Sequence, residues 1–261
     1  KGYGLGAAGG PFAPGVDPLW AGHGVAYPPL TLLVDALVVA ATGAAPYAGI
    51  VAMRAPALLG VALIAFSLVR IQRARGREPG PALWWGLLNP LLVLHFVGGA
   101  HNDALMAGVS LLAVWLVVEF PGPLARWVLA PVLCGVALAL KQQGGLTVLA
   151  VAGLPVLDAL RRATLGRRLW LLGRRAAAVT AIAVAVFAAI TWASGLGTGW
   201  TRWLTLMGSA GTIAPFGMVS QYGGIVLTWA GADPAPFKLV VAVLSNTALV
   251  AVLAWIVIRW S

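Results

Sequence analysis

The stretch ALLGVALIAFSLVRIQRARGR, residues 57–77, decides the fold class of this chain. Its apolar part continues a run that begins at residue 48, and together they give about the 20 apolar residues that a membrane-spanning helix needs. Four arginines follow at the end of this run: Arg70, Arg73, Arg75 and Arg77. Short basic segments beside membrane spans are retained in the cytoplasm, so the stretch predicts a helix that crosses a membrane and ends inside the cell.

The composition extends this prediction to the whole chain, in which 61% of 261 residues are hydrophobic and 9% are charged. Because a soluble domain carries about a quarter charged residues, most of this chain must lie in lipid. The formal net charge of +10 does not indicate nucleic-acid binding, since the basic residues lie between apolar runs. The single cysteine, Cys134, excludes an intrachain disulfide and a multi-cysteine metal site.

We expect an all-α polytopic protein of the plasma membrane. The predicted spans are residues 48–71, 83–99, 103–119, 127–141, 144–160, 176–194 and 237–258. If the first span enters from outside, twelve of the 17 basic residues lie in the cytoplasm and five lie outside. The predicted organisation is then residues 1–47, the remainder of a first external loop with an interfacial helix, and residues 48–261, a bundle of about seven transmembrane helices. The bundle includes an external loop at 195–236.

A shorter apolar run at residues 30–43 is predicted to lie at the outer interface or to be re-entrant. Asp35 sits at its middle, where a carboxylate in the bilayer costs roughly 2.5–3.5 kcal/mol on the insertion scale. A crossing here would also invert every later helix. The chain begins at Lys1 in a Gly/Pro-rich segment without an initiator methionine, so we expect further residues upstream.

The strongest candidate site is the segment GGAHND, residues 98–103. Its glycines are predicted to end one helix, and Asn102 or Asp103 can cap the next, which leaves backbone N–H groups that suit an anion. A capped turn without further function is the alternative, but it does not account for His101. Ionisable residues at membrane depth are functional by default. ATP and nucleotide-activated substrates are absent from the external face, so chemistry there requires a lipid-borne or preformed substrate.

Two cations face the same predicted side. Lys141 follows a helix in the segment ALALKQQGG, and Arg54 lies near the outer start of another helix. Either side chain can extend to the interface and complement a helix end, or can contact a phosphate group. His95 is predicted to be a packed or water-bonded histidine.

Three segments, in this order and spacing, resemble the actinobacterial polyprenol-phosphate-mannose-dependent α-1,6-mannosyltransferases of the GT-C superfamily. They are LLNPLLVLHFVGGAHNDALMAG at 87–108, ALALKQQGGLTVL at 137–149 and GLGTGWTRWLTLMGSAG at 195–211. The earlier PFAPGVDPLW and YPPL, at 11–20 and 27–30, fit the end of the first external loop of such enzymes. The resemblance implies a GT-C-type helix bundle with external interfacial helices.

The resemblance implies inverting transfer of mannose from a polyprenyl-phosphate donor to a glycan or lipoglycan acceptor such as lipomannan. The reaction forms α-1,6 linkages on the external face. It implies that Lys141, His101, Asn102 and Arg54 bind the donor phosphate, and it places Asp17, Tyr27 and Gln142 on the acceptor side. Asp103 is a candidate catalytic carboxylate, although the family's usual base is expected upstream of Lys1.

No cofactor is implied with certainty, and a divalent metal ion is possible. The KQQGG segment departs from the K-x-P-A that is common at this place, so only Lys141 carries over. The alternatives are transfer of another polyprenyl-phosphate sugar, such as arabinofuranose, and a lipid or sugar transporter or flippase. Transport is disfavoured because the sequence shows no internal repeat.

Overall fold

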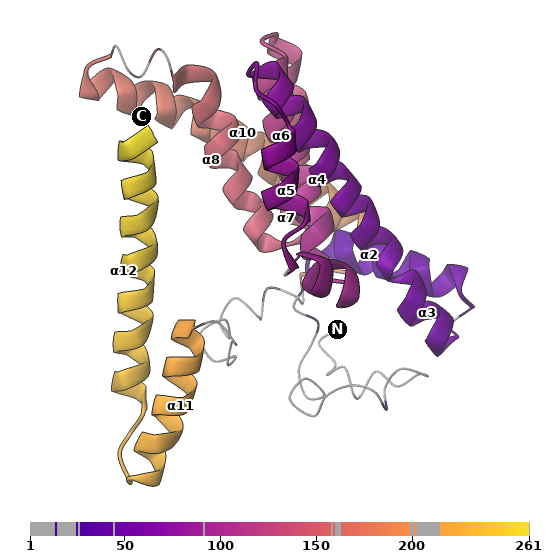
Figure 1. Ribbon diagram of the computed structural model, residues 1–261, viewed down its shortest axis with the longest axis vertical. Helices are drawn as coiled ribbons and strands as arrows, with labels where there is room; N and C mark the ends of the chain where they lie inside the picture. Colours follow the sequence, from indigo (N-terminus) through magenta and orange to yellow (C-terminus); the bar gives the residue numbers. More distant parts are fainter. Residues whose placement is uncertain are drawn as a thin grey trace. The chain divides into compact units, whose positions relative to one another are not determined.

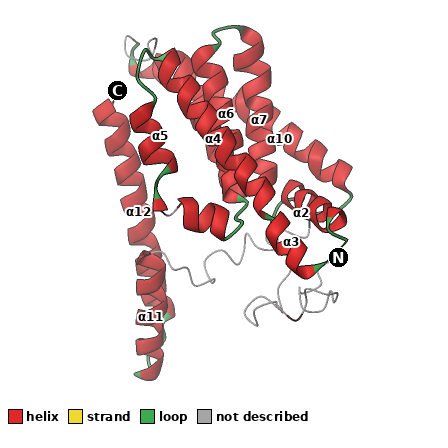
Figure 2. Cartoon of the chain, turned by 45° about the vertical axis from the view of Figure 1, so that its right-hand side comes forward, coloured by secondary structure: helices red, strands yellow, loops and turns green. Residues whose placement is uncertain are grey.

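The chain folds into helices. The computed structural model describes residues 27–43, 45–90, 92–157, 163–198 and 215–260, together with residues 14, 25, 159 and 201. Every regular element within these ranges is helical (Figure 2), which confirms the all-α fold class. The elements are α2 (Pro29–Ala41), α3 (Pro46–Ala52), α4 (Arg54–Ala74), α5 (Gly80–Leu87), η3 (Leu92–Gly98), α6 (Asp103–Glu119), η4 (Ala125–Leu129), α7 (Ala130–Leu140), η5 (Gln142–Leu146), α8 (Thr147–Gly153), η6 (Leu154–Val156), α10 (Leu165–Ser194), α11 (Pro215–Trp229) and α12 (Ala235–Trp260).

The chain divides into two compact units, residues 1–200 and 201–261. In the first unit α4 and α6 lie side by side (Figure 1) and run in the same direction, because α5 and η3 return the chain between them. Glycines allow this close packing. A Cβ atom on Gly60 would lie 2.3 Å from the backbone carbon of Ala104, and one on Gly108 would lie 2.6 Å from the Gly60 oxygen.

The helix α7 runs antiparallel to α6, and α8 and α10 complete the core of this unit. Fully buried residues from all four helices form one apolar cluster: Ala113, Cys134, Val151 and Val179. Cys134 is a free, buried thiol. On the α6–α8 contact, Thr147 Oγ1 donates to Ser110 Oγ at 2.8 Å. Because the chain passes back and forth, the helix termini gather at two opposite ends of the unit.

Within the described residues, two helical stretches are long and apolar enough to cross a membrane, Pro46–Ala74 and Gly166–Ser194. The pair Gly80–Leu87 and Leu92–Gly98 is bent by 61° and provides a third crossing if it forms one broken span. Other apolar helices in the described part of the chain are shorter, among them Pro29–Ala41 and Ala125–Leu140. The count of seven spans stays a prediction.

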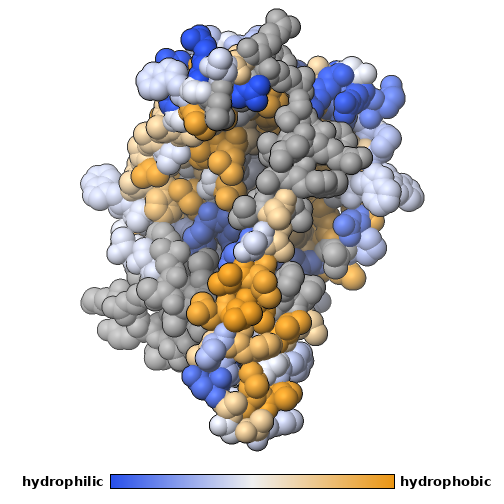
Figure 3. Space-filling view, turned by 90° about the vertical axis from the view of Figure 1, so that its left-hand side faces the viewer, coloured by the Kyte–Doolittle hydropathy of each residue, from blue (hydrophilic) through white to orange (hydrophobic). Residues whose placement is uncertain are grey.

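Large apolar side chains lie on the surface of the helices, as a lipid environment requires. Trp85 is 79% exposed and Trp170 is 65% exposed. In Figure 3 apolar residues cover broad areas of the visible face, and hydrophilic residues gather in separate patches. This surface supports a membrane protein, because a soluble monomer rarely exposes such large apolar patches.

The run at 30–43 forms α2, a helix of 13 residues. At 1.5 Å per residue α2 is about 20 Å long, shorter than the roughly 30 Å hydrocarbon core of a bilayer. It begins at Pro29, in the first turn, where a missing N–H costs nothing. Its length agrees with a helix that does not cross the membrane.

Two boundaries differ from the sequence-based expectation. The helix α10 begins at Leu165, eleven residues before the predicted span at 176–194, so it contains Arg167, Arg168, Arg174 and Arg175. Arginine and leucine are good helix formers, which allows the apolar helix to extend through the basic segment. The segment 195–236 contains the helix α11, which packs against α12: a Cβ on Gly223 would lie 2.3 Å from the Phe237 ring.

Candidate functional site

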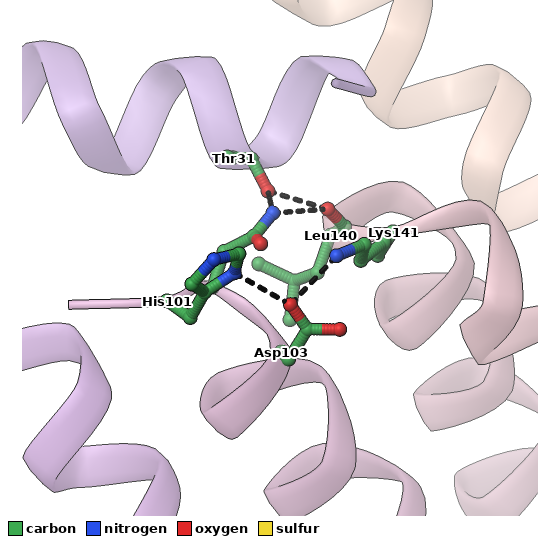
Figure 4. A network of polar contacts seen from close by, with 6 residues as sticks. Thr31, His101, Asp103, Leu140 and Lys141 are labelled. Carbon is green, nitrogen blue, oxygen red and sulfur yellow. Dashed lines mark hydrogen bonds and ion pairs between the residues drawn. The ribbon is translucent and has the colours of Figure 1, made fainter. Parts of the chain in front are cut away.

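Asp103 is the centre of a polar cluster at one end of the first unit (Figure 4). Lys141 Nζ donates to Asp103 Oδ2 at 2.6 Å, and His101 Nδ1 lies 2.9 Å from the same oxygen. The Lys141 side chain is 16% exposed. It is therefore held inside the protein by an ion pair, and does not extend freely to the interface.

The antiparallel packing of α6 and α7 produces this contact. Asp103 is the first residue of α6, and Lys141 directly follows the last residue of α7, so both lie at the same level. The Lys141 backbone is extended, with φ −157° and ψ 143°, and its carbonyl accepts a hydrogen bond from Gly144 N at 2.9 Å. Gly144 lies against α7, where a Cβ would be 2.3 Å from the Ala137 oxygen.

Asn102 connects this end of the bundle to α2. Its Nδ2 donates to Thr31 Oγ1 at 3.2 Å and to the Leu140 carbonyl at 3.4 Å, and the Thr31 hydroxyl donates to the same carbonyl. Asn102 Oδ1 is buried and has no partner among the described residues. The expectation that Asn102 or Asp103 caps α6 is wrong: Asn102 occupies the N-cap position without a side-chain cap bond. Both side chains bind other elements instead.

The turn before α6 positions the His101 ring. Ala100 has φ +50°, a left-handed conformation that is uncommon outside glycine, and His101 N donates to the Phe96 carbonyl at 3.0 Å. The His95 ring stacks on the His101 ring, with centroids 4.2 Å apart and planes 20° apart. His95 is therefore packed, and its contact is with His101. A pairing of residues 95 and 101 has no sequence signal, because it depends on the π-helical register of η3.

Arg54 lies beside the same turn. Its guanidinium donates to the Ile50 carbonyl at 2.8 Å and to the Gly98 carbonyl at 3.2 Å. Tyr27 lies on the other side of the cluster, with its ring centroid 5.8 Å from Lys141 Nζ. Gln142 begins η5 directly after Lys141. Asp17 lies outside the described residues.

A small cavity adjoins the cluster and contains a carboxyl group that the resemblance did not assign. Its volume is about 20 Å³, which is room for about one water molecule. Thr31, Asp35, His101 and Asn102 are among the residues that line it. Burial raises the pKa of Asp35 from 3.8 to about 6. Burial also raises the pKa of Tyr27, with added contributions from the negative charges of Asp103 and Asp35.

Three side chains of the cluster can offer ligands to a metal ion. His95, His101 and Asp103 each supply one ligand atom, and these atoms lie within 4.8 Å of one another. Imidazole and carboxylate ligands suit a divalent transition metal. Because Lys141 already occupies one Asp103 oxygen, an ion would have to share or displace that contact.

Chemically, the cluster places the Lys141 cation beside hydrogen-bonding side chains at a helix N-terminus that has no side-chain cap. The Asp103 carboxylate holds Lys141 and orients His101, so it is engaged and poorly suited to act as a free base. An oxyanion that reached the cluster would meet Lys141, the His101 ring and the N-terminus of α6.

Comparison with known proteins gives one consistent family. A family model described as alpha-(1->6)-mannopyranosyltransferase, N-terminal domain, matches residues 2–157. This range contains the whole of the described polar cluster.

The similar curated proteins carry the same name. Alpha-(1->6)-mannopyranosyltransferase A of Corynebacterium glutamicum is 28% identical over 262 residues, covering 96% of this chain and 52% of that protein. The protein of the same name from Mycobacterium tuberculosis is 31% identical over 228 residues, covering 82% and 43%. A probable alpha-(1->6)-mannopyranosyltransferase of Mycolicibacterium smegmatis is 32% identical over 221 residues, covering 77% and 39%. The chain thus spans about half the length of these relatives, or less. No solved structure matches it significantly.

Proposed function

The chain belongs to the alpha-(1->6)-mannopyranosyltransferase family, and from this we propose that it forms the donor-binding part of a membrane mannosyltransferase. The proposed donor is a polyprenyl-phosphate mannose, and the proposed acceptor is a cell-envelope glycan or lipoglycan such as lipomannan. The reaction takes place on the external face, inverts the donor configuration and forms an α-1,6 linkage.

The ion pair between Lys141 and Asp103, with His101 on the same carboxylate oxygen, is the observation that supports this proposal. It lies at the opposite end of the unit from the Arg70–Glu119 pair. That pair joins the arginine-rich end of α4 to the last residue of α6. The predicted charge distribution places that basic end in the cytoplasm, so the cluster faces outside. A lipid-linked sugar can be presented there without a nucleotide.

The proposed role of Lys141 is to stabilise the departing polyprenyl phosphate. When the bond from the mannosyl carbon to the phosphate oxygen breaks, the phosphate gains negative charge. A fixed cation and a helix N-terminus therefore stabilise the transition state more than the ground state. His101 and Asn102 are proposed to donate further hydrogen bonds, and Arg54 to hold the turn that carries them. Asp103 is proposed to orient Lys141 and His101.

The acceptor hydroxyl must also lose a proton to a carboxylate. Because Asp103 is engaged by two partners, the proposed base is a different carboxylate. Tyr27 and Gln142, which flank Lys141, are proposed to contact the acceptor or the donor sugar, and Asp17 is proposed to contribute to the acceptor side.

A transfer assay tests the proposal. Membranes that contain the full-length protein are supplied with polyprenyl-phosphate mannose and an α-1,6-linked mannan oligosaccharide, and product is measured by mass spectrometry. Lys141→Ala and His101→Ala should lower transfer, whereas Arg73→Ala, at the opposite end of the unit, should not. Near-native transfer by both site variants would refute the site, and transfer only from a polyprenyl-phosphate arabinofuranose would refute the choice of sugar.

A further inference from the structure

A second cluster, which the transferase proposal does not use, surrounds Arg175 in the N-terminal half of α10. Arg175 is 5% exposed. Its Nε donates to the Ala152 carbonyl at 3.0 Å, and the Trp127 ring lies against the guanidinium, 4.3 Å from Cζ to the centroid. Its Nη2 is buried and has no partner in the described parts of the chain. One face and one edge of this guanidinium are thus fixed, while another donor is left unsatisfied.

Two more arginines lie beside it. The charges of Arg126, in η4, and of Arg174 both act on Arg175. Arg126 Nε is also buried without a partner among the described residues. Within the ranges that the structure describes, no carboxylate forms an ion pair with any of the three. By contrast, Arg70, at the same end of the unit, pairs with Glu119.

This arrangement lacks a counter-ion. Buried donors in folded proteins are almost always satisfied, and unsatisfied donors on charged groups are the most costly. Three adjacent positive charges also repel one another, and a bound anion removes both costs. A phosphate group fits best because its oxygens accept the parallel hydrogen bonds that a planar guanidinium offers.

We propose that Arg126, Arg174 and Arg175 form a binding site for a phosphate group, supplied by an anionic lipid headgroup or by a soluble phosphorylated molecule. The stack on Trp127 and the hydrogen bond to the Ala152 carbonyl already fix the Arg175 side chain, so little side-chain entropy is lost on binding. The site lies at the basic end of the unit, opposite Lys141, and it is independent of mannosyl transfer.

Two binding measurements on the purified full-length protein in detergent distinguish the sources of phosphate. In the first, native mass spectrometry counts phosphatidylglycerol molecules retained by the protein, with phosphatidylcholine as the comparison lipid. In the second, inorganic phosphate is titrated, and protection of Arg126 and Arg174 from phenylglyoxal is measured. Retention of phosphatidylglycerol alone identifies a lipid site, and protection by inorganic phosphate identifies a site for soluble phosphates.

The variants are Arg126→Gln and Arg174→Gln, because Arg175 is buried and its loss can prevent folding. Each should weaken binding about tenfold or more, as expected for loss of a hydrogen bond to a charged group. Arg77→Gln, which removes an exposed arginine from the same end, should have little effect. Equal loss in Arg77→Gln, or no saturable binding in either measurement, would overturn the proposal.

Asp158 provides a further control, since it is the acid nearest in sequence to Arg174 and Arg175 and lies outside the described residues. If phosphate is the counter-ion, Asp158→Asn should leave binding unchanged. If Asp158 itself neutralises the arginines, the native protein should bind no phosphate and Asp158→Asn should create the binding, which would contradict the proposal.

Discussion

The contact between Lys141 and Asp103 has two separable consequences, one for folding and one for catalysis. Lysine neutralises a partly buried carboxylate, and in the proposed mechanism it also stabilises the departing phosphate. Removing one partner of such a pair is destabilising because the other charge is left unpaired. A single substitution at Lys141 therefore cannot separate the two roles.

A double variant separates them. Lys141→Ala should lower transfer about 10²-fold and also lower the unfolding midpoint, since it removes a transition-state contact and leaves Asp103 uncompensated. Adding Asp103→Asn removes the unpaired charge, so Lys141→Ala/Asp103→Asn should recover stability but not transfer. The measurements are transfer rates in membranes and thermal unfolding in detergent. Recovery of transfer in the double variant would show that lysine only balances the charge of Asp103.

Asp35 gives the protein a pH dependence of known sign. The pKa of its carboxyl is about 6 in the folded protein, against the ordinary 3.8 expected in the unfolded chain. Between these values the unfolded carboxyl ionises while the folded one keeps its proton. Stability should therefore fall as pH rises from about 4 to about 6, and should stay at the lower level above that.

The variant Asp35→Asn has no carboxyl group to titrate at this position. The excess of its free energy of unfolding over that of the native protein should therefore be absent near pH 4 and grow up to about pH 6. Thermal unfolding followed by tryptophan fluorescence at several pH values measures this difference. Glu78→Gln, which changes an exposed acid, is the control and should show no such growth. Parallel curves for Asp35→Asn and the native protein would contradict the assignment.

The sequence predicted part of this cluster. Lys141 and the segment 98–103 are predicted to face the same side of the membrane, and the structure brings Lys141, Asp103 and His101 into contact. The bonds of Asn102 to Thr31 and Leu140 were not predictable, since they depend on how α2 packs against the bundle. Thr31 carries no motif of its own.

At the scale of elements, the short turn after α7 decides where Lys141 points. Gly144 and Gly145 are neighbours in η5 but have different surroundings. A Cβ on Gly144 would lie 2.3 Å from the Ala137 oxygen, which is helix backbone and cannot move aside. A Cβ on Gly145 would lie 3.3 Å from Leu138 Cδ1, the end of a flexible side chain.

These neighbours form a matched pair for mutation. Gly144→Ala should displace the turn that follows Lys141, cost about 1–3 kcal/mol in stability as overpacking does, and lower transfer. Gly145→Ala should retain both properties. Transfer assays and thermal unfolding of the two variants measure the contrast. Equal tolerance of both alanines would show that close packing of the turn does not position Lys141.

Some helix bounds follow from the sequence, and others do not. The apolar run at 30–43 forms α2 with nearly the expected bounds, because Pro28 and Pro29 mark its start. The helix α10 begins eleven residues before the predicted span at 176–194, because arginine favours helices and the basic segment continues the helix. The helix α11 was missed because Gly223, Gly224 and the nearby aromatic residues are typical of an external loop.

At the scale of the whole molecule, the charge distribution predicts its direction in the membrane. Within the first unit the arginines of α4 and the N-terminal half of α10 lie at one end, and the cluster around Asp103 lies at the other. The structure thus separates the two ends, as the sequence predicts. Only chemistry applied from one side can show which end faces outside.

Single-cysteine labelling of intact cells provides that test. Cys134 is buried and is first replaced by alanine. Arg77→Cys and Gly122→Cys, at the basic end, should react with an impermeant maleimide only after lysis, whereas Ala45→Cys and Leu196→Cys should react in intact cells. The neighbouring Gly76 is unsuitable for this substitution, because it has φ +65° and a cysteine there would be strained. Basic segments in loops of this length are retained in the cytoplasm. Efficient labelling of Arg77→Cys in intact cells would show that the basic end faces outside. The Lys141 cluster would then lie in the cytoplasm, and the reason for an external lipid-linked donor would be lost.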